Sequence, residues 1–168
     1  MIVRDDDHAY RAESIAARLD IGRRQSGGTA AVCRILSTLG TMGTDSGEKR
    51  ILLVEEHPIV RLGFIQLIQQ ESHLKVCGEA ETSTEALEII DCESPDLVIV
   101  DLGLKKSSGL DLIKVVQGLH PELPLLAVSL HDETLYAQRV LKAGARGYVM
   151  KHEAPDRLLV AIERVLAG

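Results

Sequence analysis

The 168-residue chain is long enough for one compact domain and a modest additional segment, but too short for two full domains of ordinary size. Hydrophobic residues make up 45% of it and charged residues 26%, and its apolar runs all fall short of the roughly 20 residues that span a bilayer, which excludes a membrane protein. The net charge is −6, and because residues 1–50 hold eight basic and seven acidic side chains, the remainder holds 11 basic against 18 acidic ones and should repel nucleic acid.

The first residues do not have the pattern of an export signal. The stretch MIVRDDDHAY places three aspartates where a secretory signal needs a basic end followed by an apolar run. We therefore expect a cytoplasmic protein.

From Arg50 onward, short β-branched apolar runs alternate five times with amphipathic stretches of helical period, which predicts repeated βα units. The predicted strands are Ile51–Glu55, Leu74–Ala80, Leu97–Leu102, Leu125–Leu130 and Gly147–Met150. Three of them, ILLVE, LVIVDL and LLAVSL, are almost continuously apolar, as expected for parallel strands covered by helices on both faces. These three should form the centre of the sheet.

The intervening stretches are predicted to be helices. Their ranges are Pro58–Gln70, Ser83–Cys92, Leu110–Leu119, Glu133–Ala143 and Pro155–Ala167. Pro58 suits a first-turn position, and Gly144 is expected to cap the fourth helix. A broad apolar face is expected on the first helix, from Ile59, Leu62, Ile65, Leu67 and Ile68. Right-handed crossovers then favour an α/β fold with a doubly wound parallel sheet, whose ligand site lies beyond the carboxyl ends of its central strands.

Polar residues stand at those strand ends. Glu55 and Glu56 follow the first strand, Asp101 ends the third, Ser129 ends the fourth, and Lys151 lies just past the fifth. Two or three carboxylates in an oxygen-rich group suit Mg²⁺. With a lysine for fixed positive charge and a serine hydroxyl as donor, the group could hold a phosphoryl group on Asp101.

Each of these residues also has an ordinary explanation. The two glutamates could be first-turn acids favoured by a helix dipole, Lys151 a surface lysine, and Ser129 a satisfied strand hydroxyl. Asp101 is harder to explain in this way, because a charge inside an apolar run costs several kcal/mol unless it has a partner. The joint occurrence of all five favours a functional site.

Other metal-binding or redox patterns are missing from the sequence. His57, His131 and His152 fall near the predicted site edge but lack the grouping of a metal cluster, so we assign them no role. The three cysteines are widely spaced and form no C-x-x-C pair, which argues against a disulfide framework or a zinc site. We expect buried or idle thiols.

Several separated motifs resemble the receiver domain of two-component response regulators, in the branch usually joined to a LuxR-type DNA-binding domain. They are LLVEEHPIVRLG, LVIVDLGL with Gly109 eight residues after Asp101, AVSLHDE and KAGARGYVMK. The resemblance runs from about Lys49 to the C-terminus and implies a flavodoxin-like (βα)5 fold with five parallel strands in the order 2-1-3-4-5. We therefore expect a receiver domain over residues 49–168.

The resemblance also implies roles for individual residues. Asp101 matches the phosphoacceptor, and Glu55 and Glu56 match the acidic pair that binds Mg²⁺ together with Asp101 and the carbonyl of Gly103. Ser129 matches the hydroxyl that senses the phosphoryl group, and Lys151 the lysine of the site. Tyr148 matches the aromatic switch, whose movement changes the surface of the fourth helix, fifth strand and fifth helix.

The implied partners are a sensor histidine kinase or phosphotransfer protein, and a downstream protein or a homodimer partner. We expect no membrane partner, and the acidic charge balance disfavours DNA binding. Apart from self-catalysed phosphotransfer and autodephosphorylation, we expect no enzymatic activity. An aspartate-nucleophile phosphatase would want a second aspartate two residues after the nucleophile, where this chain has Gly103.

One departure from the family keeps an alternative function open. Family members mostly have at least one aspartate in the acidic pair, whereas this chain has two glutamates, and Mg²⁺ tolerates poor octahedral geometry badly. The alternative is a pseudo-receiver, a protein-binding module that works without phosphorylation.

The segment 1–48 precedes the first predicted strand. IAARLDIGRR followed by CRILSTLG resembles part of a LuxR-type helix-turn-helix, but Gly27 and Gly28 fall inside its recognition helix, where glycine is unfavourable. We expect an N-terminal extension that is flexible or a degenerate remnant of that motif.

Overall fold

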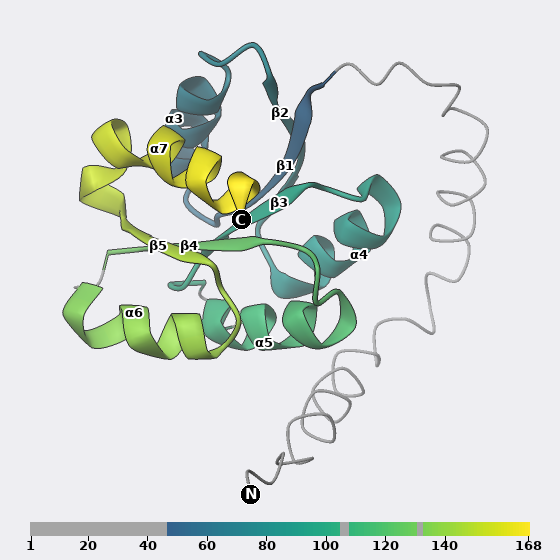
Figure 1. Cartoon of the computed structure of the whole chain (residues 1–168), viewed down its shortest axis with the longest axis vertical. Coiled ribbons are helices and arrows are strands. Elements are labelled where there is room, and N and C mark those ends of the chain that lie inside the picture. The colour runs from purple at the N-terminus through teal and green to yellow at the C-terminus, as the bar shows by residue number, and fades with distance from the viewer. Residues whose placement is uncertain (1–46, 105–107, 131–132) are drawn as a thin grey trace, which may run out of the picture.

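The computed structural model describes residues 47–104, 108–130 and 133–168 (Figure 1). The predicted N-terminal extension and its helix-turn-helix resemblance lie outside the described residues, apart from the last two positions of the extension. Within the described ranges, none of the helices is long and apolar enough to cross a membrane.

The centre of the fold is one parallel sheet. Its strands are β1 (Lys49–Val54), β2 (Leu74–Ala80), β3 (Leu97–Asp101), β4 (Leu125–Ser129) and β5 (Gly147–Met150). They are ordered β2-β1-β3-β4-β5, and every neighbouring pair is parallel. The predicted strands, their parallel pairing and their order are confirmed, with ends that differ by two residues or fewer.

Helices cover both faces of this sheet. They are α3 (Pro58–Ile68), α4 (Ser83–Glu93), α5 (Gly109–Leu119), α6 (Glu133–Lys142) and α7 (Ala154–Ala167), with a short 3-10 helix, η1 (Lys151–Glu153). Figure 1 shows α3 and α7 on one face and α4, α5 and α6 on the other. The predicted doubly wound α/β architecture is therefore confirmed, while η1 was not predicted.

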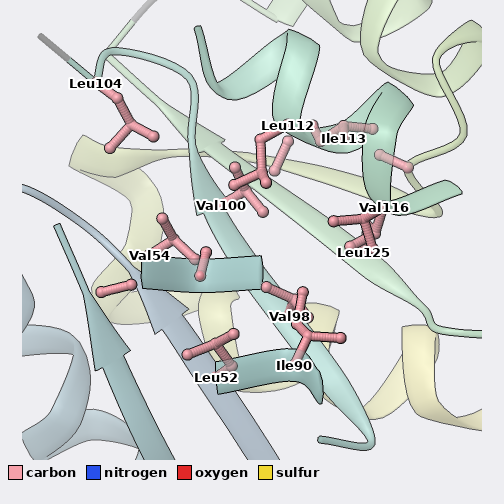
Figure 2. Packing of buried hydrophobic residues seen from close by; sticks show 14 of the residues in the cluster. Leu52, Val54, Ile90, Val98, Val100, Leu104, Leu112, Ile113, Val116 and Leu125 are labelled. Carbon is pink, nitrogen blue, oxygen red and sulfur yellow. The ribbon is translucent and has the colours of Figure 1, made fainter. Parts of the chain in front are cut away.

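Successive side chains of each central strand point to opposite faces of the sheet and pack into two separate hydrophobic clusters. In β1, Ile51 and Leu53 pack against α3 and α7, whereas Leu52 and Val54 pack against the opposite helices. Figure 2 shows the cluster on the face covered by α4, α5 and α6, in which strand residues such as Val98 lie beside Ile90 of α4. Burying each such side chain contributes about 1.5–3 kcal/mol, so strands buried on both faces must be apolar at nearly every position.

The expected apolar face of α3 is partly wrong. Ile59 is 85% exposed and Leu62 is 60% exposed, whereas Phe64 and Ile68 are the buried residues of this helix. Helical periodicity identified the helix correctly, but it did not identify which part of a broad apolar surface faces the sheet. Pro58 does occupy the first turn, as predicted.

Gly144 ends α6 as expected. Its φ of +111° lies in the left-handed region, and its N–H donates to the carbonyl of Leu141 at 3.0 Å. Because side chains other than hydrogen make this conformation unfavourable, glycine suits the turn from α6 into β5.

The described cysteines behave as ordinary thiols. Cys77 and Cys92 are both half-buried thiols, and Cys33 lies outside the described residues. Burial raises the pKa of the Cys77 thiol, an effect that nearby Glu93 reinforces and Arg50 opposes. The protonated, unreactive form of Cys77 is therefore favoured at neutral pH.

Candidate functional site

The carboxyl ends of the central strands bring the predicted site residues to one edge of the sheet. Asp101 is the last residue of β3 and pairs in register with Val128 of β4, and Ser129 pairs with Met150 of β5. Glu55 directly follows β1, and Lys151 directly follows β5. Parallel pairing therefore assembles groups that are almost 100 residues apart in the sequence.

Asp101 is buried and its two carboxylate oxygens have different partners. Oδ1 accepts a hydrogen bond from the backbone N–H of Gly103 at 3.0 Å. Oδ2 lies 2.8 Å from Nζ of Lys151, whose side chain is only 5% exposed. The carboxylate is thus fixed by the loop on one side and by a buried cation on the other.

Glu55 shares the same cation. Its Oε2 lies 2.6 Å from Nζ of Lys151, and its side chain is fully buried. Its Oε1 accepts a hydrogen bond from the backbone N–H of His57 at 2.9 Å and lies 3.0 Å from Nδ1 of the same residue. Lys151 therefore bridges the ends of β1 and β3, which the sequence could suggest only by analogy.

Glu56 completes the acidic group. Its side chain is 11% exposed, and its Oε1 lies 3.7 Å from Nε2 of His57. Three carboxylates (Glu55, Glu56 and Asp101) and one ammonium (Lys151) give this edge a formal charge of −2. One divalent cation would neutralise that charge.

The buried oxygens also favour a cation. Oε2 of Glu55 and Oδ2 of Asp101 share the ammonium of Lys151, so one positive charge is set against two buried carboxylates. Ligand atoms of Glu55, His57 and Asp101 all lie within 4.8 Å of one another. The donor set therefore fits a divalent metal ion, and it includes an imidazole that we had assigned no role.

A close backbone approach accounts for the glycine eight residues after Asp101. A Cβ added to Gly109 would lie 2.0 Å from the carbonyl oxygen of Asp101 and 2.7 Å from Cα of Leu102. No side chain fits there, so glycine allows the start of α5 to lie directly against the end of β3. Ser108 caps this helix, with its hydroxyl accepting from the N–H of Asp111 at 3.3 Å.

Arg61 is a residue of this region that the sequence did not reveal. Its guanidinium donates to the backbone carbonyl of Glu55 at 2.7 Å and forms ion pairs with Glu79 at 3.0 Å and Glu81 at 2.9 Å. Its side chain is largely buried. Because the two acids follow it by 18 and 20 positions, no local pattern pointed to this contact.

The remaining predicted residues have less specific positions. Ser129 is buried at the end of β4, on the same sheet edge as Asp101. Tyr148 is half-buried within β5 and packs against the core cluster on the α4, α5 and α6 face. Their roles in sensing and switching, and that of the Gly103 carbonyl in metal binding, stay predictions.

Comparisons with known proteins agree with this geometry. Residues 51–163 match the family described as the response regulator receiver domain. A nitrate/nitrite response regulator protein homolog of Haemophilus influenzae is 34% identical over 121 residues, covering 71% of this chain and 57% of that protein. A LuxR-family two-component response regulator structure from Aurantimonas sp. SI85-9A1 is 35% identical with a TM-score of 0.69, covering 72% of this chain and 86% of that one.

A third comparison corrects our expectation about DNA. The solved complex of the response regulator RcsB with DNA is 26% identical to this chain with a TM-score of 0.64, covering 70% of this chain and 62% of that one. The expectation that DNA binding is disfavoured is therefore wrong, because it was drawn from the overall charge of the acidic part of the chain. Contacts to nucleic acid depend on local basic groups rather than on the net charge of a domain. The chain also spans only 57% of the length of the Haemophilus relative.

Proposed function

The chain belongs to the response regulator receiver family, and we propose that it accepts a phosphoryl group on the carboxylate of Asp101 within a two-component phosphorelay. One observation supports this most directly: Asp101 is buried at the end of β3 and shares the ammonium of Lys151 with Glu55. A buried carboxylate among like charges is costly unless it has a function or a counter-ion, and here Lys151 supplies the counter-ion beside an acidic group that could hold a metal ion.

The chemistry required of Asp101 is a single substitution at phosphorus. One carboxylate oxygen attacks the phosphorus of a phosphodonor such as acetyl phosphate, and a P–O bond forms while the bond to the leaving group breaks. The leaving group departs with the electron pair, and the product is an aspartyl phosphate, which is a mixed anhydride. Lys151 lies close enough to neutralise charge on the transferred group, while the N–H of Gly103 orients the carboxylate.

Glu55, Glu56 and Asp101 would hold Mg²⁺ at this edge, with the carbonyl of Gly103 as a further ligand. The formal charge of −2 and the burial of these carboxylates support this assignment. When bound, the ion supplies charge neutralisation for the phosphoryl oxygens.

The phosphoryl group would act as a switch of a surface rather than as the source of a product. It adds negative charge and strong acceptors beside Lys151 and Ser129. We propose that Ser129 turns toward these oxygens and that Tyr148 follows, which alters the surface of α6, β5 and α7. The receiver would then present that surface to a protein partner.

Phosphoryl transfer to Asp101 can be tested directly. The full chain is incubated with acetyl phosphate and Mg²⁺, and its intact mass is measured beside those of Asp101→Asn and Asp111→Asn. Asp111 is a matched carboxylate on α5, with a half-exposed side chain paired with Lys114. We expect one added phosphoryl group on the wild type and Asp111→Asn, and none on Asp101→Asn.

The alternatives give different results in the same experiment. A folded wild type that gains no phosphoryl group from the donor would indicate a pseudo-receiver that works without phosphorylation. Sustained hydrolysis of small phosphoesters would instead indicate a phosphatase.

A further inference from the structure

His57 lies between the two glutamates of the acidic group and uses only one of its ring nitrogens. Nδ1 lies 3.0 Å from Oε1 of Glu55. Nε2 lies 3.7 Å from Oε1 of Glu56, which is beyond hydrogen-bond distance. Within the described residues, Nε2 takes part in no hydrogen bond.

Helix capping does not account for the position of the ring. His57 is the N-cap residue of α3, yet its side chain makes no capping hydrogen bond within the described part of the chain. Asparagine, aspartate or serine would cap this helix better. The contacts of the imidazole are instead with the carboxylates that follow β1.

The hydrogen bond to Glu55 determines which nitrogen has a free lone pair. An ionised carboxylate can only accept, so Nδ1 of a neutral imidazole carries the proton and donates to Oε1. Nε2 then has its lone pair available. Histidines that bind metals characteristically donate their other ring N–H to a carboxylate, which fixes the ring and raises its basicity.

We propose that His57 binds the cation of this site through Nε2, with Glu55 orienting the ring, and that the imidazole shifts the preference of the site from Mg²⁺ toward first-row transition-metal ions. Carboxylates alone suit Mg²⁺, whereas imidazole nitrogen favours ions later in the Irving–Williams order. Nε2 lies 3.7 Å from Oε1 of Glu56, and a ring nitrogen of His57 lies within 4.8 Å of carboxylate oxygens of Glu55 and Asp101, so the imidazole is placed among the carboxylates of a mixed nitrogen and oxygen site. The inference rests on the proposed function in that it concerns the same carboxylates.

The coordination of His57 can be observed without any phosphodonor. Mn²⁺ is added to the metal-free full chain, and pulsed electron paramagnetic resonance is used to detect coupling to a directly bound imidazole nitrogen. We expect this coupling in the wild type and its loss in His57→Asn, where asparagine keeps a good N-cap for α3. His152→Asn is the matched control, because His152 is exposed in η1 beside Lys151 and is not a member of the ligand group.

Affinity gives a second readout. The preference for Ni²⁺ over Mg²⁺, measured by calorimetry, should fall about tenfold or more in His57→Asn and remain unchanged in His152→Asn. Circular dichroism of each variant confirms that it is folded.

Three outcomes would overturn the inference: wild type that binds Mn²⁺ without nitrogen coupling, coupling that persists in His57→Asn, or wild type that binds no Mn²⁺. The phosphorylation experiment distinguishes this failure from failure of the proposed function. A protein phosphorylated on Asp101 that shows no nitrogen coupling keeps its function and loses only the role of His57.

Discussion

Lys151 is the residue on which the electrostatics of the site depend. Its ammonium is nearly inaccessible and lies within 2.8 Å of oxygens from two buried carboxylates, Glu55 and Asp101. The desolvation of a buried ion pair can offset what its attraction contributes, so this arrangement is not explained by a net gain in stability. Removing one partner is nevertheless costly, because the carboxylates left behind are buried without a counter-ion.

Replacing Lys151 with methionine should leave two buried carboxylates without their cation. We expect the free energy of unfolding in metal-free buffer to fall by about 3–5 kcal/mol, the usual effect of removing one partner of a buried pair. Urea denaturation followed by circular dichroism measures it. Lys114→Met is the control, since Lys114 is exposed and paired only with Asp111, and its loss should change stability by about 1 kcal/mol or less.

A divalent cation should partly restore the Lys151→Met variant, because it would neutralise the same carboxylates. If the variant is as stable as the wild type without metal, the ion pairs of Lys151 do not compensate buried charge in the way we describe.

At the scale of elements, the contact between α5 and the end of β3 controls how the loop around Asp101 is held. Gly109 at the start of α5 lies directly against the backbone of Asp101, with no room for a side chain between them. The position of α5 and that of the end of β3 therefore depend on each other. Arg61 has a comparable role between α3 and the end of β2, since one guanidinium joins the Glu55 carbonyl to two acids. Contacts from α3 and α5 therefore hold the strand ends that form the site.

Two glycine substitutions should have opposite effects. In Gly109→Ala the new Cβ would meet backbone atoms that cannot rotate away, so we expect destabilisation of about 1–3 kcal/mol or more and weaker phosphoryl acceptance. In Gly63→Ala, within α3, the Cβ meets nothing within 4 Å, and the helix should gain about 0.5–1 kcal/mol. Thermal unfolding of both variants checks the pair. Equal effects would show that the close approach of α5 to β3 is not constrained.

At the scale of the whole molecule, the described residues between 47 and 168 form a complete five-stranded sheet with a hydrophobic cluster on each face. Every central strand is buried on both faces by helices from this range. This arrangement has its own core and should fold independently.

We therefore predict that residues 47–168, expressed alone, will unfold in one cooperative transition with the same midpoint as the full chain. The same fragment should gain a phosphoryl group from acetyl phosphate. Calorimetry and intact-mass measurement check the two parts. A fragment that loses the cooperative transition would show that residues 1–46 contribute to the core, and the boundary near residue 49 would then be wrong.

The sequence by itself determined the class and order of the elements. A continuous apolar run such as LVIVDL indicates a strand buried on both faces, and a periodic stretch such as Pro58–Gln70 indicates a helix buried on one face. Both patterns are local, so they can be read from the sequence without the fold. The sequence also placed Asp101 and Lys151 at strand ends, because in a parallel sheet the carboxyl ends share one edge.

Only the tertiary structure decided which groups touch at that edge. The shared contact of Lys151 with Glu55, the ring of His57 between two glutamates and the reach of Arg61 all depend on strand register and loop conformation. The exposure of Ile59 and Leu62 likewise depends on how α3 is rotated against the sheet. Periodicity is a property of neighbouring residues, whereas these contacts join positions that only folding brings together.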